Sequence, residues 1–532
     1  MPKTGERAAL AIYTGTIFLS ALLLFSVQPM FAKMVLPLLG GASAVWAVSM
    51  CFFQALLLLG YAWAHLLDRT VPPRLALTLQ LAVFALALSA LPIGLRAGSA
   101  EAASDGAYLQ LIVILAAGVG LPFFALAANA PLLQAWFSRI GHAQSANAYF
   151  LYRASNAGSL AALAAYPFLV EPLLPLRLQS RVWAVGFVLL GAAVAACGWL
   201  ALLSARAAPA EVRNDPVAAP RNLGEVARLR LAWAFLAFVP SGLLVAFTTY
   251  VTTDLASAPL LWVIPLALYL ATFIAAFRDR PPISPRVLSI AQPVTVALTL
   301  VLMEWDASFA WVLSCAAGTL AFAVTSLACH LKLYEQRPAT EHLTDFYLWL
   351  SIGGALGGIF SALIAPHLFS NVLEYPLLLA LGLSGRLGWR QPGARRGDWR
   401  LLLAALAAAA VLALAVAYLA PWSWTPTRRL YALAAFAAML VAAWRWIVLE
   451  QAATLALVLA VALVPNGNRP IHVARSFYGT HRVVEPPGGI VRLLLHGVTL
   501  HGAEWTADAR PGAQVRPRPL TYYHPTGPLA RG

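Results

Sequence analysis

The sequence predicts an all-α polytopic membrane protein of about 14 transmembrane helices in two halves, with a small C-terminal β-hairpin region. Of its 532 residues, 61% are hydrophobic and only 11% are charged, whereas soluble domains carry about 25% charged residues. Apolar runs of about 20 residues, long enough to cross a bilayer, recur between residues 9 and 464. The chain becomes polar from Pro465 onward. This pattern excludes a soluble globular enzyme as the main body.

The first six apolar segments form the first predicted membrane half, residues 1–204. Lys3 and Arg7 precede the first segment, and no small-residue processing site follows it. We therefore expect a first spanning helix and not a cleaved signal peptide. The six segments are predicted at residues 9–27, 43–66, 74–94, 107–129, 146–170 and 181–204.

A polar linker at residues 205–228 separates this half from a second predicted half, residues 229–385. A weak internal repeat supports the division: when Phe150 is aligned with Phe346, Ser155 falls on Ser351 and Gly158 on Gly354. Six segments, a linker and six more segments are the layout of a two-half bundle. The second six are predicted at residues 229–247, 256–277, 287–303, 308–330, 344–366 and 369–385.

Charges in the loops predict the orientation. The net charge of +15 comes from arginines gathered in alternate short loops, the 205–228 linker included. Lys and Arg accumulate in cytoplasmic loops, so we expect a multi-pass protein of the cell's inner membrane with a cytoplasmic N-terminus and cytoplasmic linker. The expected partner is the lipid bilayer, and the basic charge predicts no nucleic-acid partner.

Residues 386–464 are predicted to hold a basic loop and additional membrane helices. Two apolar runs follow the loop, at 401–419 and 430–464. The second run has 35 residues, too many for one crossing and few for two. Hydropathy therefore leaves open whether the chain crosses 14 or 15 times.

The polar tail, residues 465–532, is predicted to begin a soluble β-region. Runs rich in β-branched and aromatic residues at 470–484 and 490–503 flank a Pro-Pro-Gly-Gly turn signal, which indicates a β-hairpin. His496 and His501 are expected on opposite faces of one strand, a poor geometry for shared ligation, so no metal site is predicted.

Polar residues within the apolar segments are candidates for a membrane cavity. Arg153 and Asn156 lie one helical turn apart and well inside their segment, which indicates a substrate or ion pathway. Glycines at 353, 354, 357 and 358 give two small-residue pairs at spacing four. They predict close helix packing, because a phosphate loop would need a preceding strand.

Two stretches resemble a known family. Residues 25–41 (FSVQPMFAKMVLPLLGG) and 52–65 (FFQALLLLGYAWAH) resemble the membrane region of bacterial fused major-facilitator and spermidine-synthase proteins. Residues 474–483 (ARSFYGTHRV), 494–504 (LLHGVTLHGAE) and 519–529 (PLTYYHPTGPL) resemble the β-region of their synthase part. The resemblance implies a major-facilitator-like membrane bundle and an integral membrane polyamine aminopropyltransferase.

The resemblance also implies which parts of a synthase are present. The catalytic Rossmann-like domain would follow residue 529, so this chain is expected to hold no complete catalytic site and to be inactive alone. Tyr523 and His524 match a substrate-binding Tyr-His element, and Glu504 stands where the family has glutamine. Decarboxylated S-adenosylmethionine would be the donor of a complete protein only. This chain is expected to bind no cofactor; its expected partners are a polyamine and a downstream or separate synthase domain.

Three functions remain open at this stage. The first is the membrane-anchored synthase, and the alternative is a major-facilitator-type secondary transporter with an accessory β-tail. A structural membrane scaffold is the third. Because the nucleoside donor is a cytosolic metabolite, the synthase hypothesis predicts a cytoplasmic tail, and hence an even number of crossings.

Overall fold

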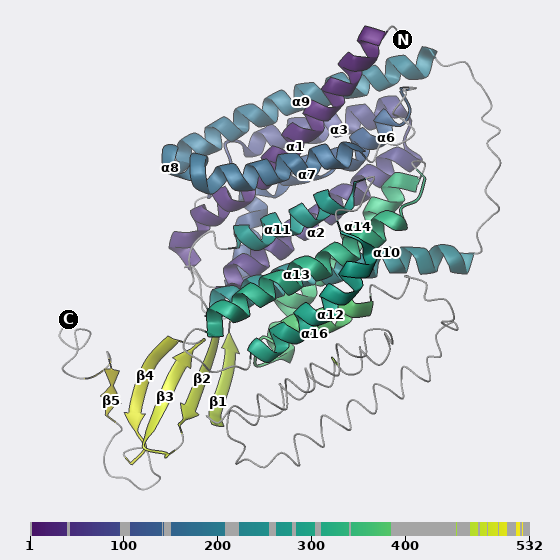
Figure 1. Ribbon diagram of the computed structural model, residues 1–532. Coiled ribbons are helices and arrows are strands. Elements are labelled where there is room, and N and C mark those ends of the chain that lie inside the picture. The colour runs from purple at the N-terminus through teal and green to yellow at the C-terminus, as the bar shows by residue number, and fades with distance from the viewer. Residues whose placement is uncertain are drawn as a thin grey trace.

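A computed structural model of the chain shows a bundle of long helices with a small β-sheet at one end (Figure 1). The fold class predicted from the sequence, a helical membrane bundle with a C-terminal β-region, is confirmed. The structure describes residues 3–39, 43–95, 107–140, 142, 150–207, 223–254, 262–278, 283–303, 310–339, 342–384, 454, 469–476, 479–486, 488–497, 499–507, 518–521 and 524.

The first half contains a helix at each of its six predicted segments. Two of them are interrupted by a π-helical turn next to a proline, which lacks the N–H group that continues a regular α-helix. The elements are α1 (Lys3–Leu39), α2 (Ser43–Thr70), α3 (Pro73–Ala87), η1 (Leu88–Ala90), α4 (Ala107–Leu115), η3 (Ala116–Gly120), α5 (Leu121–Ala127), α6 (Asn129–Phe137), α7 (Phe150–Ala165), η5 (Tyr166–Val170), α8 (Glu171–Leu173) and α9 (Leu176–Ala207).

The second half repeats this layout. Its elements are α10 (Leu223–Asp254), α11 (Val263–Ala276), α12 (Pro285–Leu302), α13 (Ala310–Glu335), α14 (Leu343–Ile359), η7 (Phe360–Ile364), α15 (Ala365–Leu368) and α16 (Glu374–Gly382). The π-turn η7 follows α14 as η5 follows α7, in agreement with the internal repeat.

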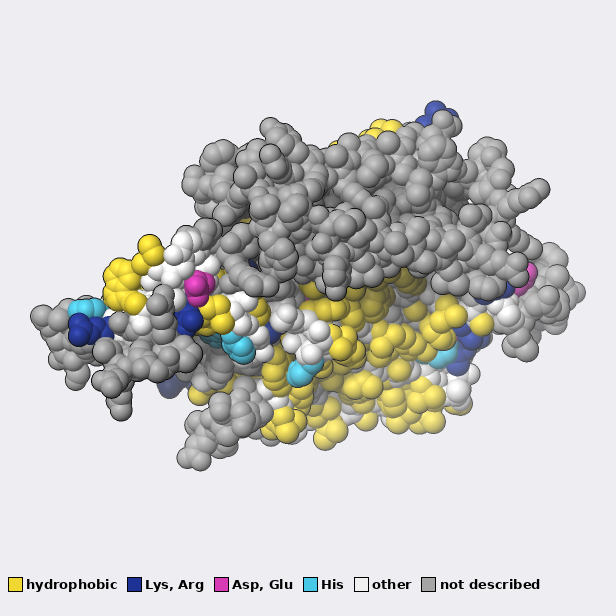
Figure 2. All heavy atoms as spheres, turned by 90° about the horizontal axis from the view of Figure 1, so that it is seen from below, with side chains coloured by type: hydrophobic (Ala, Val, Ile, Leu, Met, Phe, Trp, Pro, Cys, Tyr) yellow, Lys and Arg dark blue, Asp and Glu magenta, His cyan; other side chains and the backbone are white. Residues whose placement is uncertain are grey.

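Among the described residues, eight helical stretches are long and apolar enough to cross a membrane, and two shorter apolar helices accompany them. In Figure 2, hydrophobic side chains gather on the part of the bundle that the grey atoms leave uncovered. Large hydrophobic residues elsewhere in the helices, such as Leu109 and Phe168, are also exposed. A lipid environment satisfies such a surface. The additional helices predicted within 386–464 lie outside the described residues, apart from Thr454.

Glycines bring helix backbones together in equivalent places of the two halves. In α7, a Cβ on Gly158 would collide with the carbonyl oxygen of Phe18 in α1. In α14, a Cβ on Gly353 or Gly357 would collide with the α10 backbone at Ala234 or Phe238. Small residues permit such contacts, so the predicted packing role is confirmed for this pair.

The two glycines of the second pair, Gly354 and Gly358, have different surroundings. Gly358 packs against the Gln54 side chain of α2, as expected of an interface residue. A Cβ on Gly354 would meet nothing closer than the Ser241 hydroxyl oxygen at 3.9 Å. Gly354 therefore has open space beside it, because that side of α14 faces a cavity.

The C-terminal sheet has more strands than the predicted hairpin. Its antiparallel strands follow chain order: β1 (Arg469–Ser476), β2 (Gly479–Glu485), β3 (Val491–His496), β4 (Thr499–Trp505) and β5 (Pro519–Leu520). The predicted turn is present, with the Gly489 N–H donating to the Pro486 carbonyl oxygen over 3.0 Å. Each predicted strand, however, is split near a glycine at positive φ, Gly479 or Gly497, where the chain folds back.

This split corrects the expected placement of the histidines. His496 ends β3 and His501 lies in β4, and their ring centroids are 5.3 Å apart, so they are not on opposite faces of one strand. His481 of β2 stacks on His496 with centroids 4.6 Å apart. Burial and the two neighbouring imidazoles lower the pKa of His481. Among the described residues, no group of three potential ligands could hold a metal ion.

The sheet and the N-terminus lie at opposite ends of the bundle (Figure 1). Both were expected on the cytoplasmic side of the membrane. In the structure, β1 packs against α15, at the end of the bundle far from the start of α1. Hydropathy could not show this, since it left the number of crossings before the tail open.

A pair of glycine substitutions tests the packing of α14. Gly357→Ala should lower the melting temperature in detergent, because its Cβ collides with backbone atoms of α10 that cannot move aside. Overpacking of this kind costs about 1–3 kcal/mol. Gly354→Ala is the matched control on the same helix and should leave the melting temperature unchanged. Equal melting temperatures of the two variants would contradict the close packing of Gly357 on the α10 backbone.

Candidate functional site

A cavity of about 150 Å³ lies between the two halves. Helices α1, α2, α5, α6 and α7 line it from the first half, and α10, α11 and α14 line it from the second. Ser155 of α7 and Ser351 of α14, which the internal repeat aligns, both line this cavity. The cavity is therefore shared by equivalent helices of the two halves.

The lining combines apolar and aromatic side chains with uncharged polar groups. None of the described lining residues is Asp, Glu, Lys, Arg or His. The polar lining residues are Ser20, Gln28, Gln54, Tyr61, Tyr152, Ser155, Asn156, Ser159, Ser241, Tyr269 and Ser351.

One hydrogen-bond chain joins the halves beside the cavity. The Gln54 amide nitrogen donates to the Ser241 hydroxyl oxygen over 2.9 Å, and that hydroxyl donates to the Gly354 carbonyl oxygen over 2.8 Å. These three residues belong to α2, α10 and α14. Each helix thus supplies a polar group that would be costly to leave without a partner in a lipid environment.

Asn156, one of the two residues that the sequence marked as cavity candidates, lines this cavity. Asn156 is only 5% exposed. Its amide nitrogen has no hydrogen-bond partner in the part of the chain that the structure describes. Arg153 was predicted with it but is exposed and does not line the cavity. Residues three apart on a helix differ by about 60° in direction, so a narrow cavity can accept one and exclude the other.

Sequence reasoning missed several lining residues. Gln28 and Gln54 line the cavity, and their signal was a polar residue in, or at the end of, an apolar segment. Ser155 and Ser351 had a signal too, since the internal repeat aligned them. Serines are common in membrane helices, so their type alone did not mark a site.

Polar contacts join the two halves toward the end of the bundle where the N-terminus lies. In α2, His65 is 3.0 Å from the Thr344 hydroxyl of α14, and this hydroxyl donates to Asp68 of α2 over 3.3 Å. The Tyr347 hydroxyl of α14 donates to the Gln134 amide oxygen of α6 over 3.1 Å. These contacts join the first half to the second.

Aromatic contacts join the two halves toward the other end. Trp46, near the start of α2, stacks on Trp262, which precedes α11, with ring centroids 5.9 Å apart. Tyr108 of α4 contacts the His367 ring of α15 with centroids 6.2 Å apart. The halves therefore touch on both sides of the cavity, through polar groups at one end and aromatic rings at the other.

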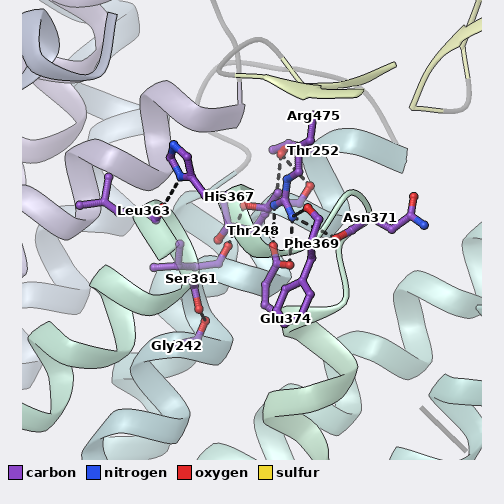
Figure 3. A network of polar contacts seen from close by, with 12 residues as sticks. Gly242, Thr248, Thr252, Ser361, Leu363, His367, Phe369, Asn371, Glu374 and Arg475 are labelled. Atoms are coloured by element: carbon purple, nitrogen blue, oxygen red, sulfur yellow. Dashed lines mark hydrogen bonds and ion pairs between the residues drawn. The ribbon is translucent and has the colours of Figure 1, made fainter. Parts of the chain in front are cut away.

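The sheet attaches at this second end through a buried ion pair (Figure 3). The two terminal nitrogens of the Arg475 guanidinium in β1 donate to the two carboxylate oxygens of Glu374 in α16, over 3.1 and 2.6 Å. The Glu374 side chain is 0% exposed and that of Arg475 7%. Arg475 also donates to the Asn371 carbonyl oxygen over 3.0 Å. Charged partners in this bidentate geometry hold β1 on the loop between α15 and α16.

The predicted substrate-binding residues of the tail are not brought into one site by the described residues. Glu504 of β4 lies 3.8 Å from the Arg492 guanidinium of β3, its register partner in the sheet. His524 is half-buried, and its N–H donates to the Thr521 carbonyl oxygen over 3.1 Å. Tyr523 lies outside the described residues.

Comparison with known proteins gives likeness in structure only. No family model matches the chain, and no curated protein matches it. The human organic anion transporter MFSD10 (TETRAN) has 16% sequence identity and a TM-score of 0.46, and the alignment covers 73% of this chain and 99% of that one.

Two bacterial structures give weaker similarity. A variant of the E. coli fucose:proton symporter FucP has 16% identity and a TM-score of 0.38, over 70% of this chain and 98% of that one. A bacterial homolog of the human lysosomal transporter Spinster, inward-facing and occupied, has 18% identity and a TM-score of 0.34, over 86% and 94%. All three TM-scores lie below 0.5, so the chain's own geometry carries the functional argument.

A substitution of Arg475 tests the attachment of the sheet. Arg475→Gln leaves the Glu374 carboxylate buried without its counter-charge, a change that costs about 3–5 kcal/mol. We expect faster hydrogen exchange in β1 and in the loop between α15 and α16. Arg492→Gln is the control, because its partners Glu485 and Glu504 are about one-third exposed. Unchanged exchange in the Arg475 variant would contradict the role of the ion pair.

Proposed function

We propose that the chain is a secondary transporter that moves a small solute across the membrane by alternating access of its two halves. The observation that carries the proposal is a cavity shared by equivalent helices of both halves, with separate contacts between the halves toward each end of the bundle. A binding place near the middle of the membrane, at the interface of two repeats, is what such a mechanism requires.

The contacts at the two ends are of a kind that can open in turn. A single hydrogen bond such as that between Tyr347 and Gln134 contributes about 0.5–1.5 kcal/mol, and an aromatic pair a similar amount. A rocking motion of one half against the other could therefore break one end while the other stays closed. The glycine contacts of backbone with backbone, at Gly158, Gly353 and Gly357, lie within each half and would be kept. The contact of Gly358 with the Gln54 side chain crosses between the halves.

The transporter was the alternative in the sequence analysis, and the synthase hypothesis has less support. Glu504 faces an arginine, which reduces its attraction for a cationic amine. The sheet also lies at the end of the bundle opposite to the N-terminus. If the N-terminus is cytoplasmic, the sheet is separated from a cytosolic nucleoside donor by the membrane.

We further propose that the N-terminal end faces the cytoplasm and the sheet faces outward. Arg69, Arg139 and Arg230 gather at the N-terminal end through contacts with His342, Asp68 and Asp345. Cytoplasmic ends of membrane helices are enriched in Arg and Lys. A chain whose N-terminus and tail lie on opposite sides crosses an odd number of times, which favours 15 crossings over 14.

Cysteine labelling tests the orientation. In a background without the four native cysteines, Ala507→Cys in the exposed turn after β4 should react with a membrane-impermeant maleimide in intact cells. Thr70→Cys, at the exposed end of α2 on the N-terminal side, should react only after permeabilisation. The reverse pattern would invert the orientation, and labelling of both in intact cells would contradict the separation of the two ends.

Paired spin labels test alternating access without a known solute. One pair replaces Trp46 and Trp262 at the sheet end, and the other replaces His65 and Thr344 at the N-terminal end. A short cross-link across the second pair should shift the first pair toward longer distances, since one closed end permits the other to open. A control pair at Lys33 and Glu171, both in the first half, should not change. Distances at the sheet end that ignore the cross-link would favour a rigid scaffold.

A further inference from the structure

We infer that the cavity binds a small uncharged molecule of about the size of one aromatic ring, with an acceptor group that meets the Asn156 amide nitrogen. This inference rests on the proposed transport function and adds the chemical class of the solute. It is carried by the charge, the size and the unused hydrogen-bond capacity of the described lining.

The lining of the cavity favours a solute without charge. Uncharged polar and apolar side chains make up the described lining. The charged pairs Lys33–Glu171 and Asp68–Arg139 are not part of it, and they satisfy each other. An ionised solute would lose its water in the cavity without gaining a counter-ion, a cost of several kcal/mol. A neutral solute avoids this cost.

The volume and the aromatic wall of the cavity favour a single ring. A volume of about 150 Å³ matches cavities that accept a benzene-sized molecule. Aromatic rings from both halves surround this volume, and their faces favour offset or edge-on contact with another ring. They belong to Phe25, Phe53, Tyr61, Phe123, Tyr152, Tyr269 and Phe273. A flat ring fits this wall better than a flexible chain of the same volume.

The hydrogen bonds of the lining side chains leave a donor for the solute. Several lining hydroxyls already donate to backbone carbonyl oxygens: Ser159 to Ser155 over 3.0 Å, and Ser351 to Leu348 over 2.8 Å. Two buried amide atoms of the lining residues, the Asn156 nitrogen and the Gln54 oxygen, have no hydrogen-bond partner in the described structure. The Asn156 nitrogen is the donor of the two. A buried donor without an acceptor is unfavourable, and a carbonyl oxygen of the solute would satisfy it. Asn156 thus selects an acceptor on the ring.

Three probes of one size separate the possibilities. Benzamide, benzoate and benzylammonium share the ring and differ in charge at pH 8. Calorimetry of the purified full chain in detergent should show binding of benzamide at least tenfold tighter than of either ion. Tighter or equal binding of an ion would overturn the inference of an uncharged solute. Binding of none of the three would overturn the inference of a ring-sized solute.

Substitutions of Asn156 test its role. Asn156→Ala should weaken benzamide binding about three- to tenfold, the effect of losing one hydrogen bond. Asn156→Asp keeps the shape but adds a carboxylate, so it should reverse the preference toward benzylammonium. Arg153→Gln, on the same helix but outside the cavity, is the control and should leave all three affinities unchanged. An Asp variant that still prefers benzamide would remove Asn156 from the site.

The spin-label experiment keeps this inference separate from the transport proposal. If the two ends open in turn but benzamide does not bind, the solute class is wrong and the transport mechanism stands. If benzamide binds and the ends never open in turn, the cavity is a binding site and transport fails. If both proposals hold, benzamide shifts the distance distribution of a labelled pair. The Asn156→Ala variant should then need about three- to tenfold more benzamide for the same shift.

Discussion

The cost of an unsatisfied polar group in hydrocarbon determines where polar residues can lie in this protein. Backbone groups satisfy it by forming helices, and side chains satisfy it by facing other helices. The Gln54 amide nitrogen and the Ser241 hydroxyl meet this requirement by bonding each other across the halves, whereas the Gln54 amide oxygen has no partner among the described residues. Asn156 meets it only in part, since its amide nitrogen has no partner among the described residues. The same constraint therefore explains both the contact between the halves and the place where a solute would be stabilised.

Close backbone contact keeps each half rigid while the interface between them remains polar and breakable. Gly158 permits α7 to lie against α1, and Gly353 and Gly357 permit α14 to lie against α10. Such contacts extend over the helix backbone and leave no room for a side chain. Between the halves lie hydrogen bonds, ring pairs and the packing of Gly358 in α14 on the Gln54 side chain of α2. Because these contacts involve side chains and not backbone against backbone, they favour motion of the halves as units.

Charge is distributed by the same rule. The N-terminal end holds Asp68, Arg139 and Asp345 in ion pairs, and the described cavity lining holds no charge. The buried pair of Glu374 and Arg475 is an exception to the avoidance of buried charge, because each ion is the partner of the other. It joins a β-strand to a helix that lies about 100 positions earlier in the chain. The attachment of the sheet to the second half thus depends on two residues that are distant in sequence.

The sequence by itself determined the helical membrane fold, its described helices and the start of a C-terminal β-region, since these depend on local hydropathy and turn residues. It also identified Asn156 and the packing glycines, because polar and small residues in an apolar segment have few roles. Only the tertiary structure excluded Arg153 and brought Gln28, Gln54 and the aligned serines to one cavity, since the rotation of each helix follows from its packing. It also divided the expected hairpin into more strands and placed the sheet opposite to the N-terminus, because the Glu374–Arg475 contact has no local signal.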